Sequence, residues 1–152
     1  MKKVLVFGAT GTVGAYTCIY LKERGYDVIA VGHRKDDNGF FALHDMKYYS
    51  VDICNKDDFN QLPVAGIFSI IHLAGILPAR MKGYNPQKYI DVNISGTLNI
   101  LQYAKKIEVS SFIYSQSIAD VAHLCGSKTP ISADVETSFP LNNDHTVYSI
   151  TK

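Results

Sequence analysis

Three side chains in the last third of the chain are suited to moving a proton: those of Ser117, Tyr148 and Lys152. Tyr148 and Lys152 are four residues apart, so on a helix they share one face. A phenol has a pKa of about 10 and is a poor base at neutral pH, but a nearby ammonium lowers that pKa by stabilising the phenolate. The three residues therefore predict a proton relay, with Tyr148 as the acid/base, Lys152 as the group that tunes it and Ser117 as a donor to a reacting oxygen.

The tyrosine–lysine spacing is not specific by itself, because Tyr84 and Lys88 share it. That earlier pair precedes Ser117 and spans Pro86, a residue type that commonly opens a helix, so we interpret it as an accidental match. The later pair is supported by its order in the chain. It follows a glycine-rich turn, an Ala-Gly strand end and Ser117.

The glycine-rich turn near the amino terminus predicts a phosphate-binding site. Residues 4–7 form a short apolar run typical of a buried strand, and residues 13–24 form an amphipathic stretch typical of a helix. Glycines at every third position between them permit a tight turn, a close approach of phosphate to the backbone and close packing of helix on strand. The helix N-terminus would then face the phosphates of a dinucleotide. The expected contacts are Gly8, Thr10, Gly11, Thr12, Val13 and Gly14.

The end of the second predicted strand, residues 27–31, bears on which nicotinamide cofactor is bound. An acid there would bond the ribose 2′-hydroxyl of NAD, whereas an arginine accommodates the 2′-phosphate of NADP. The position expected to be acidic is Gly32, and cationic residues follow it. We therefore favour NADP, with His33 and Arg34 as contacts. The alternative is NAD, served by an acid that folds back from the next loop, Asp36 or Asp37.

The remaining elements are expected to alternate, as in a parallel α/β sheet. Strands are predicted at residues 47–51, 67–75 and 111–115, helices at residues 55–62 and 86–106, and loops at residues 36–46 and 119–147. The length of the last loop favours a functional role. Ligands bind such sheets at the carboxyl ends of the strands. The candidates at those ends are Asp52, Ile53, Leu73, Ala74 and Gly75, with Asp52 alternatively a simple turn acid.

Two polar residues fall within predicted apolar segments. His72 lies in the fourth strand, where a histidine is typically a hydrogen-bonded core residue, and we favour that role over a catalytic base. Asn93 lies in the apolar stripe of helix 86–106, where a buried amide must find partners. We count Asn93 among the cofactor-site residues.

Composition narrows the classes of function. The chain has 152 residues, 47% of them hydrophobic, and a net charge of +1, which suits one globular domain and indicates neither nucleic-acid nor membrane binding. Cys18, Cys54 and Cys125 are too scattered for a disulfide framework or a metal site, and they favour a reducing compartment. No segment has the length and apolarity of a membrane span. We therefore expect a cytoplasmic protein.

Four segments together resemble those of one family: GATGTVG at residues 8–14, HLAG at 72–75, NISGTLNIL at 93–101 and YSITK at 148–152. The family is that of the extended short-chain dehydrogenases/reductases, in particular the NAD-dependent epimerases/dehydratases. The resemblance covers essentially the whole chain. It implies an α/β fold with a Rossmann-like, doubly wound parallel sheet over residues 1–152, truncated before the family's last strands and substrate domain. We accordingly expect this chain to bind a dinucleotide without turnover.

The resemblance also implies individual roles. Lys152 would contact the cofactor ribose, Asp52 the adenine amino group, and Asn93 would brace the strand end at the active site. Helix 86–106 would contribute to a homodimer. Glu136, between two prolines, is similar to a loop residue of sugar-nucleotide epimerases and dehydratases, or is a solvated turn acid. The chain departs from the family at Gly32, where an acid is usual, and at Ala122 or His123, where a Tyr-Gly pair is common.

Three functions remain open. The first hypothesis is an NAD(P)-dependent epimerase or dehydratase, which oxidises a nucleotide sugar transiently and returns the hydride. The second is an NADP-dependent carbonyl reductase, which would accumulate oxidised cofactor. The third is a non-catalytic dinucleotide-binding module, against which the intact set of Ser117, Tyr148 and Lys152 argues.

Overall fold

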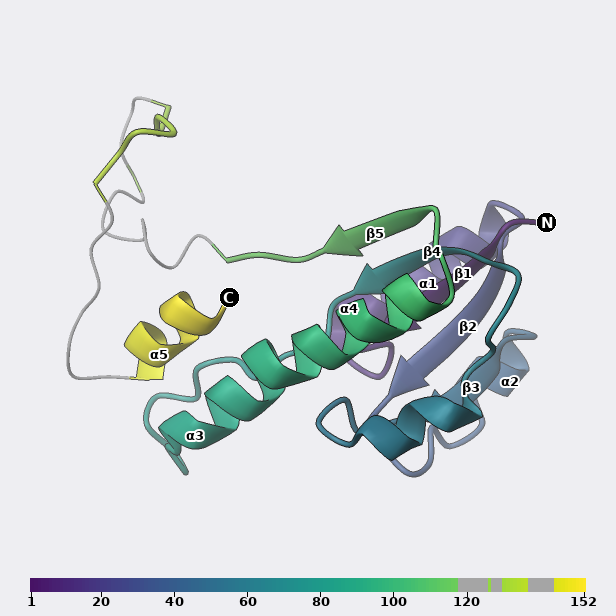
Figure 1. Ribbon diagram of the computed structural model, residues 1–152, viewed down its shortest axis with the longest axis horizontal. Helices are drawn as coiled ribbons and strands as arrows, with labels where there is room; N and C mark the ends of the chain where they lie inside the picture. The colour runs from purple at the N-terminus through teal and green to yellow at the C-terminus, as the bar shows by residue number, and fades with distance from the viewer. Residues whose placement is uncertain (118–125, 127–129, 137–143) are drawn as a thin grey trace.

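A five-stranded parallel sheet with strand order β3-β2-β1-β4-β5 forms the centre of the computed structural model (Figure 1). The structure describes residues 1–117, 126, 130–136 and 144–152. The strand order reverses between β1 and β4, and ligands bind sheets of this kind at such a switch point. The strands are β1 (Lys3–Phe7), β2 (Asp27–Gly32), β3 (Lys47–Ser50), β4 (Ile67–His72) and β5 (Ser111–Tyr114).

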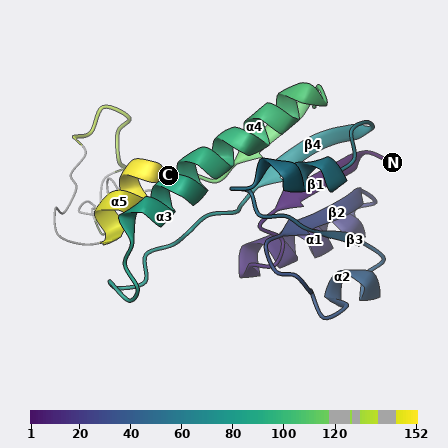
Figure 2. The same ribbon diagram turned by 60° about the horizontal axis from the view of Figure 1, so that its bottom comes forward.

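Side chains of the buried strands alternate between two apolar layers, as the pleat of a strand requires. Leu5 and Phe7 of β1 pack with side chains of η1 (Lys56–Gln61) and α4 (Thr97–Lys106). Val4 and Val6 pack on the other face with α1 (Thr12–Glu23) and α2 (Phe40–Leu43). Figures 1 and 2 show α1 and α4 on opposite sides of the sheet. The chain therefore has the predicted Rossmann-like, doubly wound fold.

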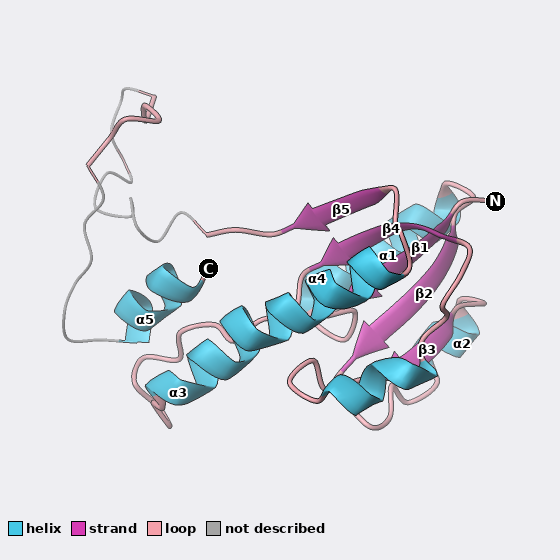
Figure 3. Ribbon diagram, in the orientation of Figure 1, coloured by secondary structure: helices cyan, strands magenta, loops and turns pink. Residues whose placement is uncertain are grey.

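The predicted helix at residues 86–106 is present, but its middle is wound differently. α3 (Pro86–Tyr89), the π-helical segment η2 (Ile90–Gly96) and α4 follow one another without a break in helical backbone angles (Figure 3). The Asn85 side chain caps the first turn by accepting from Gln87 N at 3.0 Å. A Cβ on Gly96 would lie 2.6 Å from Ile53 Cγ1, so this glycine lets the helix approach the sheet closely.

One expectation from the sequence was wrong, and one predicted helix is confirmed with a 3₁₀ winding. Residues 36–46 were expected to be a loop, but they contain α2, which Asp37 caps by accepting from Phe41 N at 2.8 Å while the Phe41 ring is buried. The helix at residues 55–62 is a short 3₁₀ turn, η1, with Asn55 as its cap.

The last helix, α5 (Asp144–Thr151), carries Tyr148 and starts one turn before it, within the predicted loop 119–147. Glu136 is exposed. Four other residues named from the sequence lie outside the described residues: Ala122, His123, Cys125 and Pro140, the second of the two prolines that flank Glu136. Among the described helices, none combines the length and the apolar character needed to cross a bilayer.

Candidate functional site

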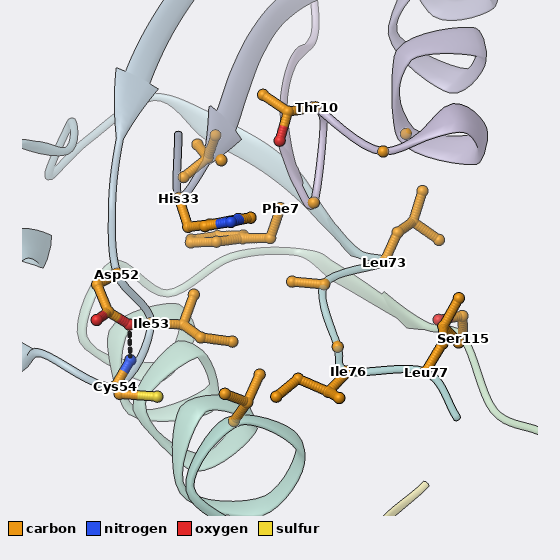
Figure 4. A pocket seen from close by; sticks show the side chains of 18 of the residues that line it. Phe7, Thr10, His33, Asp52, Ile53, Cys54, Leu73, Ile76, Leu77 and Ser115 are labelled. Carbon is orange, nitrogen blue, oxygen red and sulfur yellow. Dashed lines mark hydrogen bonds between the residues drawn. The ribbon is translucent and has the colours of Figure 1, made fainter. Parts of the chain in front are cut away.

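A cavity of about 970 Å³ opens along the carboxyl edge of the sheet (Figure 4). It is lined by residues that follow all five strands, by Tyr148 of α5 and by Lys152, which directly follows α5. All six predicted residues of the glycine turn line it. So do seven residues predicted at other strand ends: His33, Arg34, Asp52, Ile53, Leu73, Ala74 and Gly75. Two predicted site residues, Asn93 and Ser117, are not among those lining it.

Two positions of the glycine turn leave no space for a side chain. Gly8 has φ +84°, and a Cβ there would lie 2.6 Å from Ala74 N in the exit of β4. A Cβ on Gly14 would lie 2.1 Å from Gly8 O, so this glycine is needed for α1 to meet the strand. These two predicted roles are confirmed.

The start of α1 suits a phosphate. The side chains of Asn55 and Asn85 cap η1 and α3, whereas α1 begins after Gly11 without a side-chain cap. The first backbone N–H groups of a helix need partners, and an anion provides them. The uncapped helix end lies in the wall of the cavity. The residues present therefore fit the phosphates of a dinucleotide.

The acids of the loop after β2 do not line this cavity, but Asp37 lines a smaller cavity that adjoins it. Asp36 accepts from Asn38 N at 2.7 Å, and Asp37 caps α2. Arg34 lines the main cavity and also an adjoining cavity of about 430 Å³, which it shares with Thr10. A Cβ on Gly32 would lie 2.8 Å from the Thr10 side chain, so an acid there would displace this threonine.

Two hydrogen bonds fix the turn that follows β3. Asp52 accepts from Cys54 N at 2.9 Å, and Asn99 donates to Ile53 O at 2.8 Å (Figure 4 shows the first contact). Burial is the main reason that the pKa of the Cys54 thiol is raised to about 11, so the thiol is protonated at neutral pH. Figure 4 shows this turn across the cavity from Leu77 and Ser115.

Several lining residues were missed by sequence reasoning. Lys88, Asp91 and Ser95 face the cavity from the continuous helix, at spacings of three and four residues. That periodicity was visible in the sequence, but the residue types are those of an ordinary solvated helix face. The other missed residues are Phe7, Val31, Val51, Cys54, Ile76, Leu77, Val92, Ser115 and Gln116.

His72 is a core residue, as predicted. It is fully buried, and its Nε2 lies 2.8 Å from Thr97 Oγ1. Because the Thr97 hydroxyl donates to Asn93 O at 2.6 Å, it accepts from Nε2–H of His72. Burial, with a smaller contribution from Lys152, lowers the pKa of His72 to about 4.

The burial of neutral His72 predicts a pH-dependent stability. In the unfolded chain its pKa returns to 6.5, so the unfolded state binds the extra proton between pH 6.5 and 4. The free energy of unfolding has its full value above this window. It falls by roughly 3 kcal/mol as the pH is lowered through the window. Denaturant titrations from pH 7 to 4 should show this fall, and His72→Gln should remove it. The matched control, His44→Gln at an exposed position, should not, and equal slopes for both variants would contradict the assignment.

Asn93 braces the site from behind the cavity wall. Its amide oxygen accepts from Ile76 N at 2.8 Å, and its amide nitrogen donates to Thr151 Oγ1 at 3.1 Å. The amide thus joins the exit of β4 to α5, which is the bracing that the resemblance implied. Asn93 is not among the residues that line the cavity, so direct contact with a cofactor stays a prediction.

Two of the three predicted relay residues line the cavity, and the third does not. Tyr148 and Lys152 both line the cavity, and Lys152 Nζ lies over the Tyr114 ring, 4.6 Å from its centroid. Burial lowers the pKa of Lys152. Ser115 lines the cavity, whereas Ser117, two residues farther on, does not. The role of Ser117 therefore stays a prediction.

Comparisons with known proteins agree with this geometry. The model of the NAD dependent epimerase/dehydratase family matches residues 4–152. A UDP-glucose 4-epimerase of Schizosaccharomyces pombe is 31% identical over 123 residues, covering 75% of this chain and 34% of that protein. A UDP-glucuronate 4-epimerase of Thermodesulfobacterium geofontis is 28% identical over 149 residues, covering 91% and 45%.

A crystal structure shows the same fold. The UDP-glucose 4-epimerase from Bifidobacterium longum, in complex with NAD⁺ and UDP, superposes with a TM-score of 0.78 at 26% identity. The match covers 99% of this chain and 47% of that one. This chain thus spans between a third and a half of the length of these three proteins.

Proposed function

The chain belongs to the NAD-dependent epimerase/dehydratase family, and from this we propose that it carries the cofactor site and proton relay of an enzyme acting on a nucleotide sugar. One observation carries the proposal. The glycine turn, which fits a dinucleotide, and the pair Tyr148 and Lys152 line the same cavity. Relatives of the chain are epimerases of UDP-sugars. The reaction class is therefore epimerisation or dehydration.

We propose one role for each of these groups. When bound, the nicotinamide ring supplies the hydride chemistry. Tyr148 takes the proton of a ring hydroxyl and later returns it, and Lys152 holds positive charge beside it. Ser117 donates to the same substrate oxygen. The first turn of α1 binds the phosphates, and Asn93 keeps the exit of β4 and α5 in register.

Turnover in the natural protein tests this proposal. With bound dinucleotide and a UDP-hexose, a second UDP-sugar should accumulate, as detected by chromatography and NMR, without net reduction of cofactor. Stoichiometric accumulation of oxidised cofactor with a carbonyl substrate would indicate the carbonyl reductase instead. Dinucleotide binding without any turnover would indicate the non-catalytic module.

We further propose that the cofactor is NADP. Arg34 lines both cavities beside Thr10, and neither nearby acid lines the main one. Asp36 accepts from Asn38 N, and Asp37, which also lines the smaller cavity, accepts from Phe41 N. An arginine–phosphate contact contributes enough that Arg34→Ala should weaken NADPH binding by about 10- to 100-fold and NADH binding by no more than about threefold. Fluorescence titration of both cofactors measures this. The neighbouring Lys35→Ala is the matched control. Equal losses for both cofactors, or tighter NADH binding by the parent, would contradict the proposal.

We also propose that the chain forms a homodimer through the continuous helix of α3, η2 and α4. Ile90, Ile94, Leu98 and Leu101 form an exposed apolar stripe along η2 and α4, and each is at least 41% exposed. Apolar patches of this kind mark interfaces. Leu98→Lys should convert a dimer to a monomer in sedimentation experiments. Leu43→Lys, at an exposed apolar residue of α2, is the control and should leave the dimer intact. A monomeric parent protein would rule out this interface.

A further inference from the structure

The first residue of α5, Asp144, has a carboxylate that the proposed relay does not use. Asp144 is 2% exposed, and its Oδ2 accepts from Ala79 N at 2.7 Å and from Met81 N at 3.0 Å. The hydrogen bond from Met81, together with that from Ala79, holds the pKa of this carboxyl below its usual value despite burial. A buried anion therefore joins α5 to the loop between β4 and α3.

The loop that Asp144 holds is strained and adjoins the cavity. Arg80 and Met81 have φ values of +54° and +65°, a left-handed conformation that costs free energy in residues other than glycine. Backbone N–H groups that converge in such a turn form a site for an anion, and the carboxylate occupies it. The same loop begins at Gly75 and Ile76, which line the cavity.

The other end of α5 is attached to the same loop by a separate contact. Thr151 Oγ1 accepts from Asn93, which also bonds both backbone groups of Ile76. Tyr148 thus lies on a short helix that is attached to one loop at both ends, and Lys152 directly follows that helix. A helix of this length is marginal by itself, so such attachments set its position.

We propose that Asp144 is a positioning residue, whose carboxylate fixes the first turn of α5 to the β4–α3 loop and so holds Tyr148 and Lys152 against the cavity. The catalytic consequence rests on the proposed function. The attachment itself does not, because it involves only residues of this chain.

The test compares Asp144→Ala with Asp144→Asn, which keeps an oxygen that can accept from both N–H groups. The alanine variant should lower kcat of the natural protein by about 10- to 100-fold with KM changed by no more than about threefold, since misplacement affects mainly the reacting groups. The asparagine variant should recover most of kcat. Asp57→Ala, at an exposed residue of η1, is the control.

Amide hydrogen exchange provides the readout that does not depend on turnover. In Asp144→Ala, the amides of Ala79, Met81 and Tyr148 should exchange at least about tenfold faster, and the asparagine variant should restore their protection. Unchanged exchange overturns the proposal, as does faster exchange with an unchanged kcat. A parent protein that has no turnover, but whose three amides respond as expected, contradicts the proposed function and leaves the attachment established.

Discussion

Replacing Tyr148 with phenylalanine is expected to lower turnover of the natural protein by about 10²- to 10⁴-fold, the usual contribution of a positioned acid or base. The change removes one hydroxyl and keeps the ring that lines the cavity. Cofactor affinity should therefore change by no more than about threefold. Single-turnover measurements with saturating dinucleotide, together with a cofactor titration, separate the two effects.

The second tyrosine–lysine pair provides a matched control. Tyr84 precedes Lys88 at the same spacing as in the proposed pair, but Tyr84 is 36% exposed and does not line the cavity. Tyr84→Phe is expected to leave turnover unchanged. Full activity in Tyr148→Phe, or an equal loss in Tyr84→Phe, would show that the proton relay has been assigned to the wrong residues.

Gly14→Ala is expected to destabilise the fold by about 3 kcal/mol or more, the upper range for overpacking. The added methyl carbon would lie 2.1 Å from Gly8 O and 2.8 Å from Ala9 Cα, and both atoms belong to the backbone. No side-chain rotation can relieve these contacts, so α1 must move away from β1. Denaturant titration measures the loss.

A substitution at Gly11, another glycine of the same turn, distinguishes an effect on stability from an effect on cofactor binding. A Cβ on Gly11 would lie 3.3 Å from Gly8 O, so Gly11→Ala should cost less than about 1 kcal/mol of stability. Its methyl group would face the cavity and should weaken dinucleotide binding. If Gly11→Ala destabilised the chain as much as Gly14→Ala does, the steric account of the turn would be wrong.

The sequence predicted the structure best at positions where a single residue type satisfies a steric or solvation requirement. The glycine turn, the buried His72 and the small Gly96 beneath Ile53 each follow from sterics or desolvation within a recognisable element. The strand ends followed from short apolar runs, and their residues meet because parallel strands share a carboxyl edge.

The parts that could not be predicted depend on contacts between distant segments. Asp144 has its partners 63 and 65 residues earlier in the chain, so its buried hydrogen bonds could not be predicted from the local sequence. The π-helical winding of η2 likewise leaves no signature in residue type. Lys88 and Ser95 were missed for a different reason, because their residue types are those of an ordinary solvated helix face.

A calorimetric titration of this chain with NADPH tests the central claim most directly, namely that the cavity at the carboxyl edge of the sheet binds a dinucleotide. We expect one binding site per chain and at least about a tenfold loss of affinity in Gly11→Val, whose side chain would occupy the phosphate position. Absence of binding by both NADPH and NADH, or binding that Gly11→Val does not weaken, would contradict the account.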